Sequence, residues 1–600
     1  MNEMQRPGEP GERVAPANAA RTIKRMVRYL SKSRKLILWM LILLAASTVL
    51  NLFIPDLIGR AIDTLNLSAD QLTVDWQALL MILAILLGVF IFSSLFSYLQ
   101  GRLAAKLTKK TIVTIRKDTS EKLLRLPVSF FDTHKNGDIL ARLTNDIENV
   151  SNLISQAIGA LLSSAIVIVG CVVIMLLKSP ILTMVCLSTV VLNILCTAIL
   201  SKKMFGYFRK QQQAVGKMNS HVEQSISVKK TIDAYNLGDI STDECDKLSD
   251  ELTDVSVKAQ VLGGAMNPLM CLIGNLNFLL IVAVGAWMFI HGGFGITIGT
   301  IQSFTLYSRQ FTKPINELAG IFSQFMTALA SAERIFEIID TEPEADEGKQ
   351  DMKDEGPCTI TFDHVTFSYI RGVKVLDDFC LTINKGQKVA LVGKTGVGKT
   401  TLMSLLMRFY EPDRGSILID GVDIRKIPKS RLRSMVTTVL QSTAVIEGTV
   451  RENIAYSRFT ASDQEIRKAA EICCADGFID RLENGYDTAV RSEDTQLSQG
   501  ERQLLCLARS SLTAPRVLVL DEALSSVDSA TEQQIQDVLL GMMEQQTCII
   551  IAHRLSTVRN ADMIAVVSEG KVVETGQHHE LLSKHGVYYS LYKNQYVGVQ

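Results

Sequence analysis

The sequence lacks a cysteine framework, an excess of charge of either sign and a secretory leader, and each absence excludes a class of protein. Its 11 cysteines form no C-x-x-C pair and no regular ladder, so neither a zinc site nor a disulfide scaffold is expected. Lys plus Arg is 62 and Asp plus Glu is 62, which leaves no overall basic footprint for nucleic acid. The first 35 residues carry nine Lys or Arg and no apolar core, which argues against a signal peptide.

The overall composition indicates a chain that is part membrane protein and part soluble protein. A length of 600 residues predicts more than one domain, because single cores stop growing at roughly 250–300 residues. The chain is 47% hydrophobic and 21% charged, with a mean hydropathy of +0.20. These values are too apolar for a soluble protein of this length, yet too polar for a chain that lies wholly in a membrane.

The N-terminal region predicts a polar tail followed by a surface helix. Residues 1–19 are polar and rich in Pro and Gly, so we expect them to be disordered. Over 20–35, four apolar residues fall at helical spacing among Lys and Arg, which predicts an amphipathic helix on the inner membrane surface. They are Ile23, Met26, Val27 and Leu30. The alternative is a frayed basic tail.

Charge-free runs predict a helical transmembrane domain over 36–340 with six spans. An α-helix needs about 20 apolar residues to cross a bilayer. The run 259–308 has no Asp, Glu, Lys or Arg over 50 residues, and a Gly-rich turn signal at 291–295 divides it into two spans. The predicted spans are about 36–57, 76–101, 157–177, 180–201, 262–290 and 297–323.

The distribution of basic residues predicts the orientation in the cytoplasmic membrane. The connections 102–148 and 202–258 hold ten and nine Lys or Arg, whereas the other connections hold almost none. Basic loops stay on the cytoplasmic side, so both long connections and both chain termini are predicted to be cytoplasmic. Tyr235, in the second long connection, is a candidate ball joint toward a cytoplasmic domain of the protein, and ordinary helix packing is the alternative.

The sixth predicted span carries a polar stripe that is a candidate translocation path. Polar residues recur there at three- or four-residue steps and therefore share one helix face, opposite apolar residues such as Phe304 and Phe311. A cation at membrane depth should face water or a partner. The alternative is that the span ends early and Arg309 reaches the inner interface. The stripe comprises Gln302, Thr305, Arg309, Lys313 and Asn316.

The C-terminal part predicts an α/β domain over 357–596, after a charged linker over 341–356 that has no apolar pattern. Short apolar runs alternate with helical stretches, which is typical of a mostly parallel sheet. The predicted strands are 358–362, 388–391, 436–440, 517–520, 547–551 and 563–567.

A P-loop follows the second of these strands and predicts nucleotide binding. The pattern G-x-x-x-x-G-K-[ST] spans 393–400 in the required strand–loop–helix context. Its glycines let backbone N–H groups wrap a phosphate at a helix N-terminus. We expect Lys399 to reach the β- and γ-phosphates and the Thr400 hydroxyl to ligate Mg²⁺.

The run 517–522 is a second buried strand that ends in two carboxylates. An acidic pair at a strand end is weak evidence alone, but it comes about 120 residues after a P-loop. We expect Asp521 to hold the metal ion and Glu522 to polarise the attacking water.

Several further motifs resemble those of ATP-binding cassette exporters. The segment Leu497-Ser498-Gln499-Gly500-Glu501 resembles the L-S-G-G-Q signature of that family and lies shortly before the acidic strand. The six-span half resembles the exporter type of membrane domain, including Phe130-Phe131-Asp132 in its first cytoplasmic segment. The resemblance covers roughly 20–600 and is closest to bacterial multidrug and lipid half-transporters, especially the catalytic subunit of heterodimeric ones.

The resemblance implies a role for each residue that matches a family motif. Tyr369 stands where an aromatic ring stacks on adenine, and Asp528 belongs to the D-loop that faces the partner. Gln441 of the Q-loop would contact the Mg²⁺, and His553 would hold the γ-phosphate and the attacking water. The full ATP-binding set is Tyr369, Gly393, Lys394, Thr395, Gly396, Val397, Gly398, Lys399, Thr400 and Thr401.

The resemblance also implies a dimer, because the P-loop of one chain faces the signature of another. Gln499 and Glu501 depart from the usual signature, whereas Ser498 and Gly500 are kept. We expect a non-identical partner chain, with a homodimer as the alternative. The predicted activity is ATP-driven export of amphipathic compounds or lipids by alternating access, with no nucleic-acid partner. There are two alternative hypotheses. One is a peptide exporter without a processing protease domain, and the other is an ATP-gated channel on the same fold.

Overall fold

The computed structural model describes residues 18–67, 72–292, 295–352, 356–370, 372–394, 396–439, 444–491, 497–521, 529–551 and 558–593. Most of the predicted disordered segment 1–19 therefore lies outside the described residues. The chain forms two compact units. One contains residues up to 124 and 136–341, and the other contains 125–135 and the residues from 342 onward.

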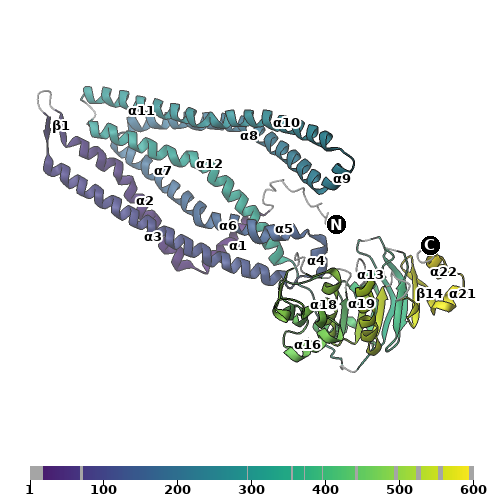
Figure 1. Cartoon of the computed structure of the whole chain (residues 1–600). Helices are drawn as coiled ribbons and strands as arrows, with labels where there is room; N and C mark the ends of the chain where they lie inside the picture. The colour runs from purple at the N-terminus through teal and green to yellow at the C-terminus, as the bar shows by residue number, and fades with distance from the viewer. Residues whose placement is uncertain are drawn as a thin grey trace. The chain divides into compact units, whose positions relative to one another are not determined.

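The first unit consists almost entirely of helices, many of which run alongside one another (Figure 1). A short hairpin of β1 (Leu65–Leu67) and β2 (Leu72–Val74) joins its second and third helices. The helices are α1 (Ala19–Ser31), α2 (Arg34–Asp63), α3 (Trp76–Leu123), α5 (Asn136–Ala141), α6 (Ile147–Asn152), α7 (Ile158–Lys178), α8 (Pro180–Ser227), α9 (Lys229–Ala234), α10 (Gly238–Gly264), α11 (Met266–Ile290) and α12 (Ile298–Asp340).

Within the described residues, five helical stretches are long and apolar enough to cross a membrane. They are Arg34–Asp63, Trp76–Leu123, Asn136–Lys178, Pro180–Ser227 and Gly238–Ile290, and they contain the first five predicted spans. Helix α12 contains the sixth predicted span but is not among the five. It carries Arg309 and Lys313, so its crossing of the membrane stays a prediction.

Helices α2 and α12 meet at a close contact near the end of α2 and the start of α12. Asp63 accepts hydrogen bonds from the Thr297 hydroxyl at 2.7 Å and from the backbone N–H of Gly299 at 2.8 Å. A Cβ atom at Gly59 would collide with the carbonyl of Gly299 and with Ser303. The two helices can approach this closely because small residues line the contact, and the Asp63 carboxylate satisfies the Gly299 N–H in the first turn of α12.

The second unit is built around a six-stranded sheet, with helices packed along it (Figure 1). Its strand order is β14-β13-β5-β12-β11-β8, and all neighbouring strands are parallel except the pair β13 and β14. The bounds are β5 (Lys388–Val392), β8 (Val436–Val439), β11 (Val517–Asp521), β12 (Thr547–Ile551), β13 (Met563–Ser568) and β14 (Lys571–Gly576). This sheet confirms the predicted α/β fold with a mostly parallel sheet.

A four-stranded antiparallel sheet, which the sequence reading did not predict as a separate layer, completes the second unit. Its order is β4-β3-β6-β7. The strands are β3 (Ile360–Phe367), β4 (Leu376–Ile383), β6 (Arg414–Ile419) and β7 (Val422–Asp423). Apolar residues of both sheets share one core, in which Phe379, Leu391 and Leu405 are fully or almost fully buried.

The remaining described elements of the second unit are short helices and one small strand pair. Helix α4 is the segment of 125–135 that joins α3 to α5 along the chain. The elements are α4 (Val128–Thr133), α13 (Lys399–Leu406), α14 (Lys429–Met435), β9 (Gly448–Thr449), α15 (Val450–Ala455), α16 (Asp463–Ile472), α17 (Asp476–Ile479), β10 (Ala489–Val490), α18 (Gln499–Ser511), α19 (Ser529–Met542), α21 (His578–Ser583) and α22 (Val587–Tyr592).

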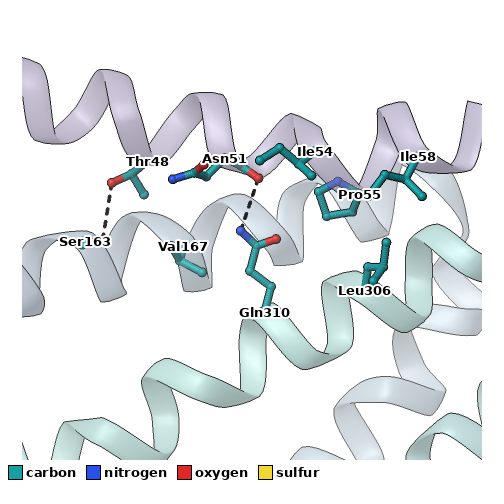
Figure 2. A pocket seen from close by; sticks show the side chains of 9 residues that line it. All are labelled: Thr48, Asn51, Ile54, Pro55, Ile58, Ser163, Val167, Leu306 and Gln310. Atoms are coloured by element: carbon teal, nitrogen blue, oxygen red, sulfur yellow. Dashed lines mark hydrogen bonds between the residues drawn. The ribbon is translucent and has the colours of Figure 1, made fainter. Parts of the chain in front are cut away.

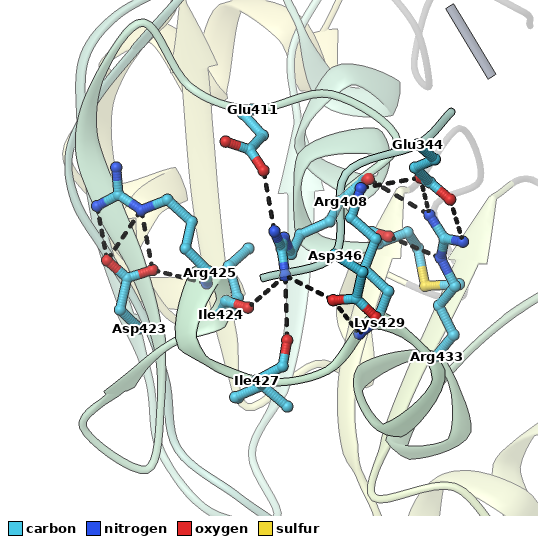
Figure 3. A network of polar contacts seen from close by, with 11 residues as sticks. Glu344, Asp346, Arg408, Glu411, Asp423, Ile424, Arg425, Ile427, Lys429 and Arg433 are labelled. Atoms are coloured by element: carbon cyan, nitrogen blue, oxygen red, sulfur yellow. Dashed lines mark hydrogen bonds and ion pairs between the residues drawn. The ribbon is translucent and has the colours of Figure 1, made fainter. Parts of the chain in front are cut away.

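The described part of the predicted linker 341–356 is bound to the second unit by ion pairs (Figure 3). Glu344 accepts hydrogen bonds from Arg433 at 2.6 and 3.1 Å and pairs with Lys429 at 3.0 Å. Burial raises the pKa of Glu344, but the hydrogen bonds from Arg433 and Lys429 outweigh it, so the pKa is lowered. The segment therefore docks on the domain, although its own sequence shows no apolar pattern.

Arg408 joins this network to the C-terminal end of α13. Its guanidinium donates to the carbonyl oxygens of Ile424 and Ile427 at 3.2 and 3.0 Å and pairs with Glu411 at 3.0 Å. It also lies 3.9 Å from Asp346 of the linker (Figure 3). The helix that begins at the P-loop thus ends against residues that hold the linker.

Candidate ATP-binding and hydrolysis site

The P-loop connects the buried strand β5 to helix α13, as its sequence predicts. Gly396 and Gly398 have φ of +85° and +102°, a region that favours glycine. A Cβ atom at Gly398 would lie 2.8 Å from Leu376 Cδ2 and 3.2 Å from the carbonyl oxygen of Val375. The loop geometry therefore requires glycine at 398, for both backbone and packing reasons.

Lys399 is the first residue of α13 and is 5% exposed. Its ammonium donates to the carbonyl oxygens of Gly393 and Lys394 at 2.5 and 3.2 Å, so it is folded back over the loop. Thr400 is exposed at the next position, and Thr401 is buried. The unpaired N–H groups of a helix N-terminus, together with this ammonium, suit a phosphate anion.

The strands that precede the other predicted hydrolysis residues are neighbours of β5, the strand before the P-loop, or lie further along the same parallel run. Strands β5, β12, β11 and β8 are adjacent and parallel, so their C-terminal ends lie along one edge of the sheet. Asp521 is the last residue of β11 and is half-buried there. Gln441 follows β8, Glu522 follows β11 and His553 follows β12 in the sequence.

Five of the predicted site residues lie outside the described residues. They are Thr395, Gln441, Glu522, Asp528 and His553. The described strands β8, β11 and β12 precede Gln441, Glu522 and His553, respectively, in the sequence. Their predicted roles stay predictions.

The predicted signature forms the N-terminus of α18. Ser498 is the N-cap, and its hydroxyl accepts from the backbone N–H of Glu501 at 3.2 Å. The Glu501 carboxylate in turn accepts from the backbone N–H of Ser498 at 2.8 Å, which completes a capping box. Leu497 and Gly500 are buried, whereas the Gln499 side chain is exposed. Glu501, one of the two departures from the usual signature, therefore stabilises this helix start and adds a negative charge there.

Tyr369, the predicted adenine partner, is 49% exposed and belongs to an aromatic cluster. Its ring packs edge-on against Phe367 and Tyr410, with ring centroids 4.8 and 5.0 Å apart, respectively. The Tyr369 hydroxyl donates to the Thr401 hydroxyl at 3.3 Å. This arrangement links the exposed ring to the first turn of α13.

Tyr410 connects this cluster to α4 and was missed by the sequence reading. Its hydroxyl donates to the Asp132 carboxylate at 2.6 Å. Burial raises the pKa of Tyr410, and the neighbouring Asp132 carboxylate raises it further. In the sequence, only the aromatic pair 130–131 and Asp132 indicated that this segment makes a specific contact. No sequence pattern identified Tyr410 as the residue that it contacts.

The predicted path residues of α12 do not all share one environment in the first unit. Arg309 and Lys313 are exposed, and Gln302 is half-buried. Thr305 is buried at 5% exposure and donates to the Ile301 carbonyl at 3.2 Å, because it lies at the edge of the stripe, toward neighbouring helices. The side chain of Asn316 is outside the described residues. Phe304 and Phe311, on the opposite face, are buried.

The sequence matches two protein families. The ABC transporter transmembrane region family matches residues 37–315, and the ABC transporter family matches residues 376–525. The second match covers the P-loop, the signature and the acidic strand end.

Characterised and uncharacterised bacterial proteins are similar over almost the whole chain. The ABC transporter ATP-binding protein YfiC of Bacillus subtilis is 37% identical, over 96% of this chain and 94% of its own length. A fatty acid ABC transporter ATP-binding/permease protein of Mycobacterium tuberculosis is 36% identical, over 94% of this chain and 95% of its own. The ATP-dependent lipid A-core flippase of Salmonella typhimurium is 32% identical, over 87% and 90%, respectively.

Proposed function

The chain belongs to the ABC transporter family, as a half-transporter with one membrane domain and one ATPase domain, and we propose that it exports amphipathic small molecules or lipids across the cytoplasmic membrane. ATP binding and hydrolysis at the interface of two cassettes would drive alternating access. The observation that carries the proposal is the parallel sheet itself: the strand before the P-loop, the strand that ends in Asp521, and β8 and β12 lie side by side in the same direction.

The residues present at this edge fit a magnesium ion. The Thr400 hydroxyl is exposed at the start of α13, and the half-buried Asp521 carboxylate ends β11. Both are oxygen ligands of the kind that Mg²⁺ prefers, and Gln441 would add a third. When bound, the ion would neutralise phosphate charge, while Lys399 and the α13 N-terminus orient the phosphates and Glu522 takes a proton from the attacking water.

We infer that the cargo is amphipathic because two of the relatives reported above have a lipid cargo in their names. One is named as a fatty acid transporter and another as a lipid A-core flippase. The long apolar helices and the exposed cations Arg309 and Lys313 are compatible with an amphiphile that has both an apolar and a polar part. Both termini and both long connections would face the cytoplasm, as the distribution of Lys and Arg predicts.

We also infer that the partner is a non-identical half-transporter. With a partner that has the usual signature, the site that this chain completes through Gln499 and Glu501 would differ from the site that the partner completes here. Such asymmetry is simplest in a heterodimer, where only one of the two sites must turn over rapidly.

One experiment tests cargo transport and partner identity together. The tagged chain is purified from its own host cells in mild detergent and reconstituted with its partner into vesicles containing a fluorescent phospholipid. We expect a second, different half-transporter to co-purify, and ATP with Mg²⁺ to drive net lipid movement between leaflets. Recovery of this chain as a fully active homodimer would contradict the heterodimer. Lipid flux that only follows a concentration gradient would favour the hypothesis of an ATP-gated channel. Movement of peptides alone would favour the hypothesis of a peptide exporter.

Tyr410→Phe tests whether α4 transmits changes at the nucleotide site. The substitution removes the hydroxyl that bonds to Asp132 but keeps the ring against Tyr369 and Phe367. Because a hydrogen bond to a charged group contributes about 1.5–3 kcal/mol, its loss should loosen α4. We expect ATP affinity to stay near normal and the number of molecules moved per ATP hydrolysed to fall several-fold. Tyr456→Phe, at an exposed ring elsewhere, is the control. An unchanged transport-to-hydrolysis ratio would refute the role.

A further inference from the structure

The membrane unit contains a cavity between α2, α7 and α12 whose chemistry is distinct from the charged stripe of α12. It has a volume of about 330 Å³, and Figure 2 shows its lining side chains. Leu306 and Gln310 are the residues of α12 that line it, whereas Arg309 and Lys313 are exposed elsewhere on the same helix. Any molecule held in this cavity therefore meets different groups from one that contacts the stripe.

One end of the cavity carries a hydrogen-bond acceptor that is not satisfied within the described residues. The Gln310 side chain donates through Nε2 to the carbonyl oxygen of Asn51 at 3.4 Å, which orients its amide (Figure 2). Its Oε1 atom is buried and has no hydrogen-bond partner among the described residues. Leaving a buried acceptor unpaired costs free energy, so a ligand that donates a hydrogen bond here would be favoured.

Asn51 supplies a second side-chain amide to the lining of the cavity. Its Oδ1 atom accepts from the Ser93 hydroxyl at 2.8 Å, which fixes the orientation of the side-chain amide. The Nδ2 group then remains to donate, and no hydrogen bond from it is found among the described residues. Thr48 and Ser163, whose hydroxyls lie 3.4 Å apart, form the next polar pair along the cavity.

The rest of the lining is apolar, and no charged side chain is among the nine described lining residues. Ile54, Pro55, Ile58, Val167 and Leu306 form these walls. A carboxylate or phosphate placed here would lose its hydration without gaining a cation, whereas an uncharged head would not bear that cost. A hydrocarbon chain would gain by burial against the same walls.

We propose that this cavity binds an uncharged amphiphile whose head group both donates and accepts hydrogen bonds, such as a primary amide or an alcohol. The head donates to Gln310 Oε1 and accepts from Asn51 Nδ2, and the hydrocarbon chain lies along Ile58, Leu306 and Val167. The inference rests on the proposed function and names the chemical class of one of its cargoes.

The test compares two ligands that differ only in the head group. The purified complex in lipid nanodiscs is titrated with radiolabelled oleamide and, separately, with oleate. Gln310→Leu and Gln310→Met remove the amide at nearly constant volume. Gln100→Leu, at a half-buried glutamine of α3 that does not line the cavity, is the matched control. We expect wild type and the control to bind oleamide at least about tenfold more tightly than either Gln310 variant. Oleate binding should be weaker and independent of residue 310.

Equal oleamide affinity in wild type and both Gln310 variants would overturn the cavity assignment, and so would oleate binding that depends on Gln310 in the same way. Retained ATPase activity in the variants shows that the complex is assembled. Failure of the cavity assignment alone leaves ATP-driven lipid movement by the wild-type complex intact. Loss of the proposed function instead appears as the absence of that movement while oleamide still binds.

Discussion

Glu522→Gln is expected to leave ATP binding nearly unchanged and to stop steady hydrolysis. Glu522 directly follows Asp521, the last residue of β11. Asp521 is predicted to hold the metal ion, so the Glu522 carboxylate is the one that remains to act as the base. An amide cannot accept the proton of the attacking water, and loss of a general base typically lowers a rate about 10²–10⁴-fold. The measurement is steady-state phosphate release by the purified complex, together with nucleotide retained after gel filtration.

The same variant should trap ATP between closed cassettes. Because hydrolysis no longer opens the dimer, we expect retained nucleotide to be ATP rather than ADP. Glu471→Gln, at an exposed position of α16, is the control for the loss of one negative charge. Phosphate release within a few-fold of wild type would show that another group acts as the base.

Lys399→Ala is expected to act one step earlier and to weaken ATP binding. The ammonium is buried and already oriented by the carbonyl oxygens of Gly393 and Lys394, so little ordering is needed before it bonds to phosphate. Each hydrogen bond to a charged group contributes about 1.5–3 kcal/mol, so losing one should weaken ATP binding at least about tenfold. Binding of a fluorescent ATP analogue and phosphate release are the two measurements.

Lys399→Arg should not rescue the site, because the larger planar guanidinium does not fit a position that is 5% exposed. Lys468→Ala, at an exposed lysine of α16, should behave as wild type. Together with Glu522→Gln, these variants separate binding from hydrolysis. Normal ATP affinity in Lys399→Ala would contradict the phosphate-binding role.

The local features of the chain were predictable because they depend on residues close together in the sequence. Charge-free runs anticipated the stretches that contain α2, α3, α7, α8 and α11, since an apolar helix of sufficient length is favoured by local composition alone. The P-loop between β5 and α13 could also be predicted from the sequence, because its turn needs glycine at fixed positions such as Gly398.

The sequence by itself thus determined the two-part architecture, the first five apolar helical stretches and the position of the P-loop between β5 and α13. Only the tertiary structure decided which side chains meet across long separations. Tyr410 meets Asp132, Glu344 meets Arg433, and Gln310 meets Asn51. Each of these contacts joins segments whose own patterns are unrelated, so no local periodicity could reveal them. They exist because the packing of the helices and sheets brings polar groups from distant segments next to one another, at exposed and part-buried positions.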